Sequence, residues 1–208
     1  FKMNLIAIES SSSICGVSLF INGKIKETIE IEENRVHAKL LPVFLNDIIL
    51  KNNVSVDDID GVAISSGPGS YTGLRIGMSL AKGFAFSKKI PIVPIPTLES
   101  MNLEVKKKGH YYILLHSHKN IVFSQLFQDG KILNKPESLS FEQLKKYRKW
   151  GYGLGKLSKN VQCNEVKPSS ISIGKLALLN FDSLATNQYH QVNPEYITNI
   201  KFKKINDS

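Results

Sequence analysis

Short apolar runs separated by polar turns mark the beginning of the chain, and they are typical of β-strands. Residues 4–8 and 14–21 are mostly apolar, and in residues 24–31 isoleucines recur on one side of an alternating pattern. These runs predict three strands. The dipeptide Asn22-Gly23 stands between the second and third runs, and it supplies the positive φ angles of a type I′ turn. The second and third strands are therefore expected to pair antiparallel.

A helical pattern follows in residues 37–51. Its apolar stripe recurs at helical spacing and consists of Leu40, Leu41, Phe44, Leu45 and Ile48. Pro42 lies inside this stripe, and a proline removes a backbone donor and clashes with the preceding turn. We therefore expect the helix either to begin near Leu40 or to be kinked early.

The next elements form one crossover. Residues 61–64 and 90–95 are predicted to be strands, with a helix from about residue 72 to residue 86 between them. Two strands that are joined through a helix should be parallel, and the connection between them should be right-handed.

A similar order of elements begins again after residue 101. Three further strands are predicted at residues 111–115, 121–127 and 131–133, with a hairpin turn at Asp129-Gly130. Helices are predicted at residues 141–147 and 173–184. The repetition predicts a duplicated α/β unit whose second copy is truncated. With Met3 taken as the natural first residue, the two subdomains are expected to span residues 3–103 and 104–208.

The composition is that of an ordinary globular protein, with 42% hydrophobic residues and a net charge of +9. No apolar run approaches the roughly 18 residues that span a bilayer, and no signal peptide is present, so a cytoplasmic protein without membrane contact is expected. Cys15 and Cys163 stand far apart, which argues against a disulfide framework or a zinc site. The charge is compatible with a nucleic-acid partner, but the lysine clusters at 106–108, 145–149 and 201–204 are interpreted as solvated surface.

The most distinctive segment is Ser65-Ser66-Gly67-Pro68-Gly69-Ser70-Tyr71-Thr72-Gly73-Leu74-Arg75-Ile76-Gly77. Its glycines permit a strained turn after a strand, and Ser70 or Thr72 can cap a helix whose free N–H groups face an anion or a partner. The segment lacks the Lys-Ser or Lys-Thr of a Walker A loop, and Thr72 stands where GxGxxG needs a third glycine. From the residues alone, a structural turn is favoured over a phosphate cradle.

The helix that follows this turn has small or apolar residues around most of its circumference. Gly73, Gly77, Ala81 and Ala85 recur every four residues and form a ridge. Such a helix has to be covered on more than one side, and a ridge of small residues lets another helix approach closely. Two covers remain open, namely the helix of residues 37–51 or a helix of another chain.

Four segments of the chain resemble the TsaB (YeaZ) family. They are Leu5-Ile6-Ala7-Ile8-Glu9-Ser10-Ser11, His37-Ala38 with Leu40-Leu41-Pro42, the segment from Gly67 to Gly77 with Lys82-Gly83, and Pro194-Glu195-Tyr196-Ile197. The resemblance implies the duplicated fold of actin-like ATPases, also called RNase H-like, in which two α/β subdomains contain mixed sheets flanked by helices. The chain departs from the family at Glu9, where Asp is usual, and at residues 116–119, which replace an Asp-Ala-Arg element.

The resemblance implies a non-catalytic accessory subunit. Proteins similar to TsaB support a TsaD-type catalytic subunit, which transfers a threonylcarbamoyl group to the adenosine beside the anticodon of ANN-decoding tRNAs. A TsaE-type ATPase and the tRNA are expected to join through the complex, and ATP and a metal to be bound by the catalytic partner. In the catalytic paralogue a His-x-x-x-His pair binds the metal, whereas here Leu41 stands four residues after His37. No metal or cofactor is therefore expected on this chain alone.

Two enzymatic alternatives remain open. A nucleotide-dependent enzyme of this superfamily needs an early carboxylate in the second subdomain and a glycine pair, but residues 111–123 contain no Asp or Glu and the chain has no Gly-Gly. A metal-dependent hydrolase, glycoprotease-like or nuclease-like, needs several converging carboxylates or an activated nucleophile. Glu9 and Ser70 are candidates for these roles, but no partners for them can be named. We therefore expect no catalytic site.

The partner surface is predicted on the two helices of the first subdomain, because their apolar residues exceed what one small subdomain needs to bury. The expected interface residues are Leu41, Phe44, Leu45, Gly73, Leu74, Gly77, Met78, Ala81 and Ala85. The same surface is expected to form a homodimer when the partner is absent. Ser10, Ser11 and Ser12, in the polar turn after the first strand, are candidate anion-binding residues, although an ordinary surface turn is the favoured interpretation.

Overall fold

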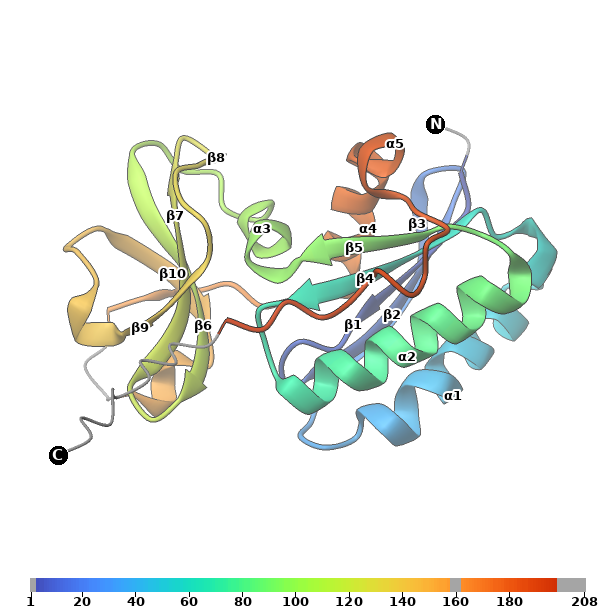
Figure 1. The fold of residues 1–208 in the computed structure, drawn as a ribbon, viewed down its shortest axis with the longest axis horizontal. Helices are drawn as coiled ribbons and strands as arrows, with labels where there is room; N and C mark the ends of the chain where they lie inside the picture. The colour runs from blue at the N-terminus through green and yellow to red at the C-terminus, as the bar shows by residue number, and fades with distance from the viewer. Residues whose placement is uncertain (1–2, 158–161, 198–208) are drawn as a thin grey trace, which may run out of the picture.

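The computed structural model describes residues 3–157 and 162–197, and its strands form two sheets that lie side by side (Figure 1). Both sheets are mixed, as predicted. The lysine cluster at residues 201–204 lies outside the described residues. Within the described part of the chain, no helix is long and apolar enough to cross a membrane.

The first sheet is built from the apolar runs of the first subdomain. Its strands are β1 (Leu5–Glu9), β2 (Ile14–Ile21), β3 (Lys24–Glu32), β4 (Gly61–Gly67) and β5 (Ile92–Pro96), in the order β3-β2-β1-β4-β5. β1 pairs antiparallel with β2 and parallel with β4, and β4 pairs parallel with β5, as the crossover predicted. The predicted hairpin is also confirmed, because Asn22 and Gly23 have φ angles of 53° and 73°.

Helices cover both faces of the first sheet (Figure 1). They are α1 (His37–Lys51) and α2 (Tyr71–Lys88) on one face, and α4 (Ser170–Leu179) and α5 (Phe181–Leu184) on the other. A short 3-10 helix, η1 (Val56–Asp58), leads into β4. Because side chains alternate along a strand, Ile8 of β1 packs with α1 and α2, whereas Ala7 packs with α4.

Helix α1 begins at His37, which excludes a start near Leu40, and the alternative of an early kink stays a prediction. Pro42 lies inside the helix, where it cannot donate a backbone hydrogen bond. Leu41 and Leu45 are buried beside the sheet. This packing stabilises the first turns of α1 in spite of the proline, since most helical stability in proteins comes from a buried apolar face.

Helix α4 packs on the first sheet, although residues 104–208 were predicted to form the second subdomain. Ile173 and Ala177 are fully buried in the cluster that contains Phe20. A Cβ added to Gly174 would lie 2.1 Å from the Phe20 ring, so this close approach requires a glycine. The predicted boundary therefore does not hold for α4 and α5, because their apolar residues cover the face of the first sheet that α1 and α2 leave open.

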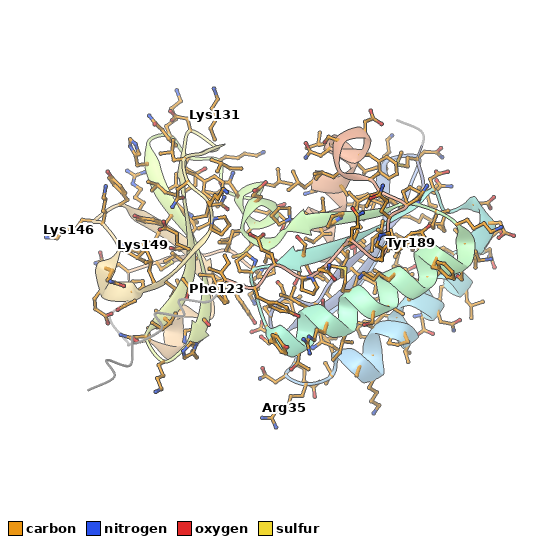
Figure 2. All side chains as sticks on the ribbon, viewed as in Figure 1. Arg35, Phe123, Lys131, Lys146, Lys149 and Tyr189 are labelled. Carbon is orange, nitrogen blue, oxygen red and sulfur yellow. The ribbon has the colours of Figure 1, made fainter. Side chains whose placement is uncertain are left out.

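The chain returns from α5 toward the second sheet along the first one (Figure 1). Tyr189, labelled in Figure 2, donates its hydroxyl to the carbonyl oxygen of Ile90 at 2.9 Å. Further along, the N–H of Glu195 donates to the carbonyl oxygen of Ser66 at 2.7 Å. Gly67 makes this crossing possible, because its φ is 114° and an added Cβ would lie 2.6 Å from the Glu195 carbonyl oxygen.

Helix α3 (Thr97–Asn102) leads from the first sheet into the second. The second sheet consists of β6 (His110–His118), β7 (Ile121–Gln128), β8 (Lys131–Ile132), β9 (Glu137–Ser140), β10 (Arg148–Tyr152) and β11 (Asn164–Glu165). Their order is β11-β10-β6-β7-β8, and β9 pairs with β7. The predicted turn between β7 and β8 is confirmed, because Asp129 and Gly130 have φ angles of 52° and 82°.

Residues 141–147 do not form the predicted helix. A 3-10 helix, η2 (Phe141–Gln143), is followed by an irregular segment and then by β10. Another 3-10 helix, η3 (Leu154–Lys156), follows β10. Phe141, Leu144 and Tyr147 are spaced by three, as residues on one side of a helix can be, but they are half-buried and pack over β6 and β7 as an irregular cover. Tertiary packing on the sheet has overridden a short helical pattern.

Candidate functional site

A cleft of about 1360 Å³ opens where the two subdomains meet. On the first subdomain it is lined by the serine turn, residues 11–13, and by residues 69–73 at the start of α2. On the second subdomain it is lined by residues 115–118 of β6 and by Tyr152, and the returning segment 195–197 also borders it. The serine turn and the glycine-rich segment, which are distant in sequence, therefore face the second sheet together.

The candidate anion-binding serines form this turn, but most of their polar groups are used within the chain. Ser10 is fully buried, and its N–H donates to Ser65 Oγ at 3.1 Å. Ser11 donates both its N–H and its hydroxyl to Glu9 Oε1, at 2.5 Å each. Ser12 Oγ accepts a backbone N–H at 3.0 Å. An anion that approached the turn would compete with the Glu9 carboxylate for Ser11, so anion binding by these serines stays a prediction.

Glu9 is the buried acid behind the serine turn. Its side chain is wholly buried at the end of β1, and burial raises the pKa of Glu9 to about 7, although hydrogen bonds from Ser11 act in the opposite direction. Among the described residues, Glu9 Oε2 and Ser10 Oγ have no hydrogen-bond partner. A carboxyl group in this state exchanges a proton near neutral pH.

Three histidines line the cleft, and two of them hydrogen-bond to backbone carbonyl groups. Nε2 of the buried His37 lies 3.1 Å from the Ile14 carbonyl oxygen, and Nε2 of His116 lies 3.0 Å from that of Lys119. His118 Nδ1 lies 3.0 Å from a neighbouring serine hydroxyl. His37 is thus buried and held by a contact inside the chain. In the part of the chain that the structure describes, no three His, Cys, Asp or Glu side chains are grouped so as to hold a metal ion.

An aromatic and cationic cluster stands at the rim of the cleft. The Arg75 guanidinium carbon lies 4.0 Å from the centre of the Tyr71 ring, and Arg75 Nε donates to the Tyr196 hydroxyl at 3.0 Å. The two tyrosine rings are 4.7 Å apart. Arg75 and Tyr196 stand in two different segments that resemble the family, but nothing in the sequence indicated that the two residues meet.

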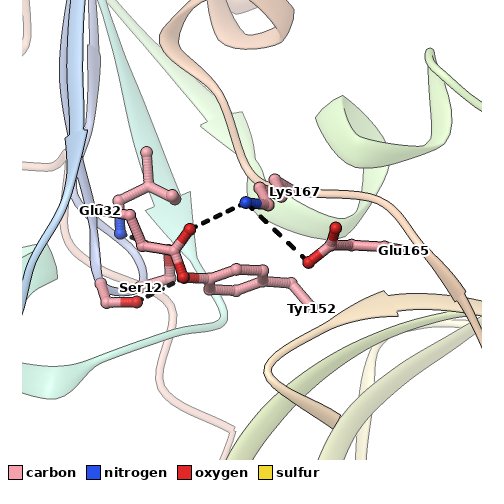
Figure 3. Close-up of polar contacts among 7 residues, drawn as sticks. Ser12, Glu32, Tyr152, Glu165 and Lys167 are labelled. Carbon is pink, nitrogen blue, oxygen red and sulfur yellow. Dashed lines mark hydrogen bonds and ion pairs between the residues drawn. The ribbon is translucent and has the colours of Figure 1, made fainter. Parts of the chain in front are cut away.

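A polar network joins the two subdomains beside the cleft (Figure 3). The Tyr152 hydroxyl donates to Glu32 Oε1 at 2.7 Å and lies 2.6 Å from Ser13 Oγ. Lys167 Nζ lies 2.8 Å from Glu32 Oε2 and 4.0 Å from Glu165 Oε1. Burial raises the pKa of Tyr152 to about 12, so its hydroxyl keeps its proton near neutral pH. The sequence did not indicate this junction.

The nine predicted interface residues lie on α1 and α2, but eight of them are buried inside the chain and Phe44 is half-buried. The expectation that the small-residue ridge is left open is therefore wrong. Its glycines admit the serine turn, because an added Cβ would lie 2.2 Å from the Ser10 carbonyl oxygen at Gly73 and 2.1 Å from Ser10 Oγ at Gly77. The two alanines of the ridge pack in the core beside the sheet. A partner can reach only the other sides of these helices.

The outer sides of α1 and α2 carry a second set of apolar residues, which we call the outer helix face. It consists of Leu40, Val43, Phe44, Ile76, Leu80 and Phe84. Val43 is 47% exposed, and the other five are half-buried. The two helices lie side by side (Figure 1), so each partly covers the other. Gly83 is exposed on the same side of α2 as Leu80, and open space surrounds the position of its missing Cβ.

A family model described as TsaD, tRNA N6-adenosine threonylcarbamoyltransferase, matches residues 29–199 of the chain. The tRNA threonylcarbamoyladenosine biosynthesis protein TsaB of Haemophilus influenzae is 31% identical over 100 residues, which cover 48% of this chain and 42% of that protein. TsaB of Bacillus subtilis is 26% identical over 144 residues, which cover 63% of this chain and 62% of that protein. The chain thus spans less than two thirds of the length of these curated relatives.

Two solved structures from Pseudomonas aeruginosa have the same fold. One is titled YeaZ, and the other is described as an uncharacterized protein with similarity to peptidase YEAZ. Their TM-scores are 0.79 and 0.80, and both are 19% identical to this chain, of which they cover 94%, while the chain covers 100% of each. These likenesses, with the two mixed sheets, confirm the predicted fold class.

Proposed function

The chain belongs to the family that the TsaD model describes and, within it, to the TsaB (YeaZ) group, and from this membership we propose that it is a non-catalytic accessory subunit in threonylcarbamoyladenosine synthesis on tRNA. Its role is to bind a TsaD-type catalytic subunit, which transfers the threonylcarbamoyl group to the adenosine beside the anticodon of ANN-decoding tRNAs. That partner binds the ATP and the metal, and a TsaE-type ATPase joins the full complex.

The outer helix face is the observation that carries this proposal. Six apolar side chains on two adjacent helices remain partly in contact with water. Full burial of a large apolar side chain is worth about 1.5 to 3 kcal/mol, so covering the exposed parts of this set favours association. A pair of helices from a related subunit packs on such a surface as a four-helix bundle. Without the partner, the same face pairs with itself in a homodimer.

The contents of the cleft favour an accessory role over an independent enzyme. The N–H and hydroxyl of Ser11 already donate to Glu9, so the turn has fewer donors for a phosphate group. Glu9 is buried, and two-metal hydrolysis needs several carboxylates that converge on one site. These two features support the view that the cleft does not turn over a substrate by itself.

Two matched glycine substitutions test the proposed docking surface. Gly83→Arg places a bulky charge on the outer helix face, and Gly155→Arg places the same group on the second subdomain, where a Cβ also has open space. Replacing Gly83 in a helix interior does not weaken the fold, since glycine is about 1 kcal/mol less favourable there than good helix formers such as arginine. We expect Gly83→Arg to weaken binding to a TsaD-type partner at least tenfold, and Gly155→Arg to leave binding unchanged.

The readouts are sedimentation of the chain with its partner, tRNA modification by the mixture, and ATP turnover by the purified chain with and without the partner. Full binding and full modification by Gly83→Arg would place the interface elsewhere. Sustained ATP turnover by the chain alone would favour the nucleotide-dependent enzyme over the accessory subunit.

A further inference from the structure

The positive charge of the chain is concentrated in the second subdomain. Residues 3–103 contain nine Lys and Arg against ten Asp and Glu, whereas residues 104–149 contain ten against four. The sequence alone favoured a solvated surface for the clusters at 106–108 and 145–149. The fold changes that interpretation, because it brings these two clusters together.

The register of the second sheet sets where these charges lie. Tyr111 of β6 packs on the side of α3, so His110 before it faces the opposite, outer side. His110 is paired with Gln128 across β6 and β7, and Gln128 is paired with Lys131 across β7 and β8. Residues paired directly across strands share a face. Lys131 and His110 therefore stand on the outer face of the sheet.

The second cluster reaches the same face through a ring contact. The Tyr147 ring lies 5.1 Å from the His110 ring in a stacked arrangement. Tyr147 directly follows Lys145 and Lys146 in the chain, and Gly109 alone separates residues 106–108 from the start of β6 at His110. Figure 2 shows Lys131 and Lys146 on the periphery of the second subdomain.

We call residues 106–108, Lys131, Lys145 and Lys146 the basic outer face, from which Arg148 is excluded because it is paired with Tyr111 and lies on the opposite side of the sheet. All six side chains are exposed. The ion pairs of the described residues are formed by lysines outside this face. The acidic residues of this subdomain do not neutralise it.

Two of those acidic residues are bound to other groups. Asp129 accepts the N–H of Gly109 at 2.8 Å, and Glu142 accepts the side-chain amide of Asn120 at 3.1 Å. The lysines of the basic outer face therefore project into solvent without a carboxylate partner in the described residues.

We propose that the basic outer face binds the phosphate backbone of the tRNA that the complex modifies. The inference rests on the proposed function, because it names the surface of this accessory subunit that meets the substrate. Lysines neutralise phosphates without reading bases, so the contact is salt-dependent and insensitive to sequence. The stacked rings of His110 and Tyr147 offer a flat surface for an unpaired base beside these charges.

The composition of the face favours RNA over a membrane. A membrane-surface anchor needs apolar side chains among its charges. In the described part of the second subdomain up to residue 157, the large apolar side chains that are exposed are Ile132 and Leu133, at 48% and 46%. Two half-exposed aliphatic residues form a small anchor compared with six exposed cationic side chains.

A pair of double substitutions tests the proposal with equal loss of charge. Lys145→Gln with Lys146→Gln removes two charges from the basic outer face, and Lys24→Gln with Lys26→Gln removes two exposed charges from β3. The probe is an unmodified transcript of an ANN-decoding tRNA. Its affinity for the full chain, alone and with the TsaD-type partner, is measured by fluorescence anisotropy between 50 and 200 mM salt.

The slope of log affinity against log salt is expected to become shallower by roughly 1.4 to 1.8 for the Lys145 and Lys146 variant, at 0.7 to 0.9 per lost phosphate contact. The Lys24 and Lys26 variant should keep the slope of the unchanged chain. An equal effect of the two variants, or no effect of the first, would overturn the proposal. The proposal would also be overturned if the Lys145 and Lys146 substitutions reduced binding to phosphatidylserine vesicles but did not reduce binding to tRNA.

Sedimentation of each variant with the partner separates this inference from the proposed function. If the chain does not bind the partner at all, the accessory role fails, whatever the tRNA measurement gives. If the chain binds the partner and the Lys145 and Lys146 substitutions leave the salt slope unchanged, the accessory role stands and the basic outer face is not an RNA surface. Thermal melting confirms that both variants are folded.

Discussion

The two subdomains cover their sheets in different ways. The first sheet has helices on both faces, α1 and α2 on one and α4 and α5 on the other. The second sheet has α3 on one face and irregular segments with two 3-10 helices over the other. The first subdomain is almost neutral, and the second carries the excess of lysine.

This difference has a structural cause, because α4, the longest helix in the second half of the chain, packs on the first sheet and not on the second. α4 follows β11 in sequence but completes the first sheet, and it leaves the second sheet without a helix on its outer face. Turns and strand ends then supply the surface of the second subdomain, and these are the places where lysine is tolerated. The first subdomain thus buries its sheet between two helical layers, whereas the second exposes charge.

The largest effect is expected from a substitution that disrupts the packing of α4 on the first sheet. Phe20 is 1% exposed and its ring fills the space beside Gly174, so Phe20→Ala should cost about 3 to 5 kcal/mol of unfolding free energy. Leu179 lies on α4, as Gly174 does, but its side chain is 74% exposed. Leu179→Ala should therefore change the free energy of unfolding by less than about 0.5 kcal/mol. Urea denaturation measures both. A small loss for Phe20→Ala would mean that α4 is not a structural layer of the first sheet.

The next effect tests the buried acid where the two subdomains meet. Because the pKa of Glu9 is raised from 4.5 to about 7, the folded chain keeps this proton while the unfolded chain releases it. The stability contributed by the protonated group is full below about pH 4.5 and is lost as the pH rises to about 7. At pH 8, Glu9→Gln should therefore be more stable than the unchanged chain by up to roughly 3 kcal/mol.

The measurement for Glu9 is the difference in unfolding free energy between the two proteins at pH 5 and at pH 8. The amide oxygen of glutamine can still accept from Ser11, so the variant keeps the turn. If the difference does not grow between these two pH values, the carboxyl is already ionised in the folded chain at pH 5.

Two glycines of α2 compare the inner and outer sides of one helix. Gly77→Ala places a Cβ 2.1 Å from Ser10 Oγ, and this overpacking should cost about 1 to 3 kcal/mol. Gly83→Ala adds a methyl group in open space, and it should stabilise the chain by up to about 1 kcal/mol. Thermal melting of both variants gives the sign. Two changes of the same sign would mean that α2 does not pack on the serine turn.

The accuracy of the predictions from sequence also differs between the two subdomains. In the first subdomain, complete layers of packing set the apolar periods. The bounds of β2 and the Asn22-Gly23 hairpin were therefore predicted correctly, and the helical pattern of residues 37–51 coincides with α1, although Pro42 left its start open. In the second subdomain, the apolar residues of segment 141–147 have helical spacing, but they cover the sheet without forming the predicted helix. The docking of α4 on the first sheet could not be predicted, because the sequence pattern gives an apolar helix face but not the sheet that it meets.

The candidate site shows a similar limit. The small-residue ridge on α2 correctly indicated a close approach, but sequence could not say whether Gly73 and Gly77 meet another chain or Ser10 of the same chain. The cleft was not predicted at all, since it depends on Tyr152 and Tyr196, which come from distant segments. Periodicity identifies which side of an element is buried, and the partner that buries it is decided by the tertiary fold.

The smallest expected effect concerns the polar network that holds the two unequal subdomains together. Tyr152→Phe keeps the ring but removes the hydroxyl that donates to Glu32 and contacts Ser13, so the loss should be about 1 to 2 kcal/mol. The pKa of Tyr152 is raised from 10 to about 12, so its contribution is full below pH 10 and is lost as the pH rises to about 12. Unfolding of both proteins at pH 7 and at pH 11 should therefore show a smaller difference in unfolding free energy at the higher pH.

Combining Tyr152→Phe with Ser13→Ala sharpens the result, since residues in direct contact should show a coupling energy of at least about 0.5 kcal/mol. Additive losses would mean that the hydroxyl of Tyr152 does not hold the first subdomain through Ser13.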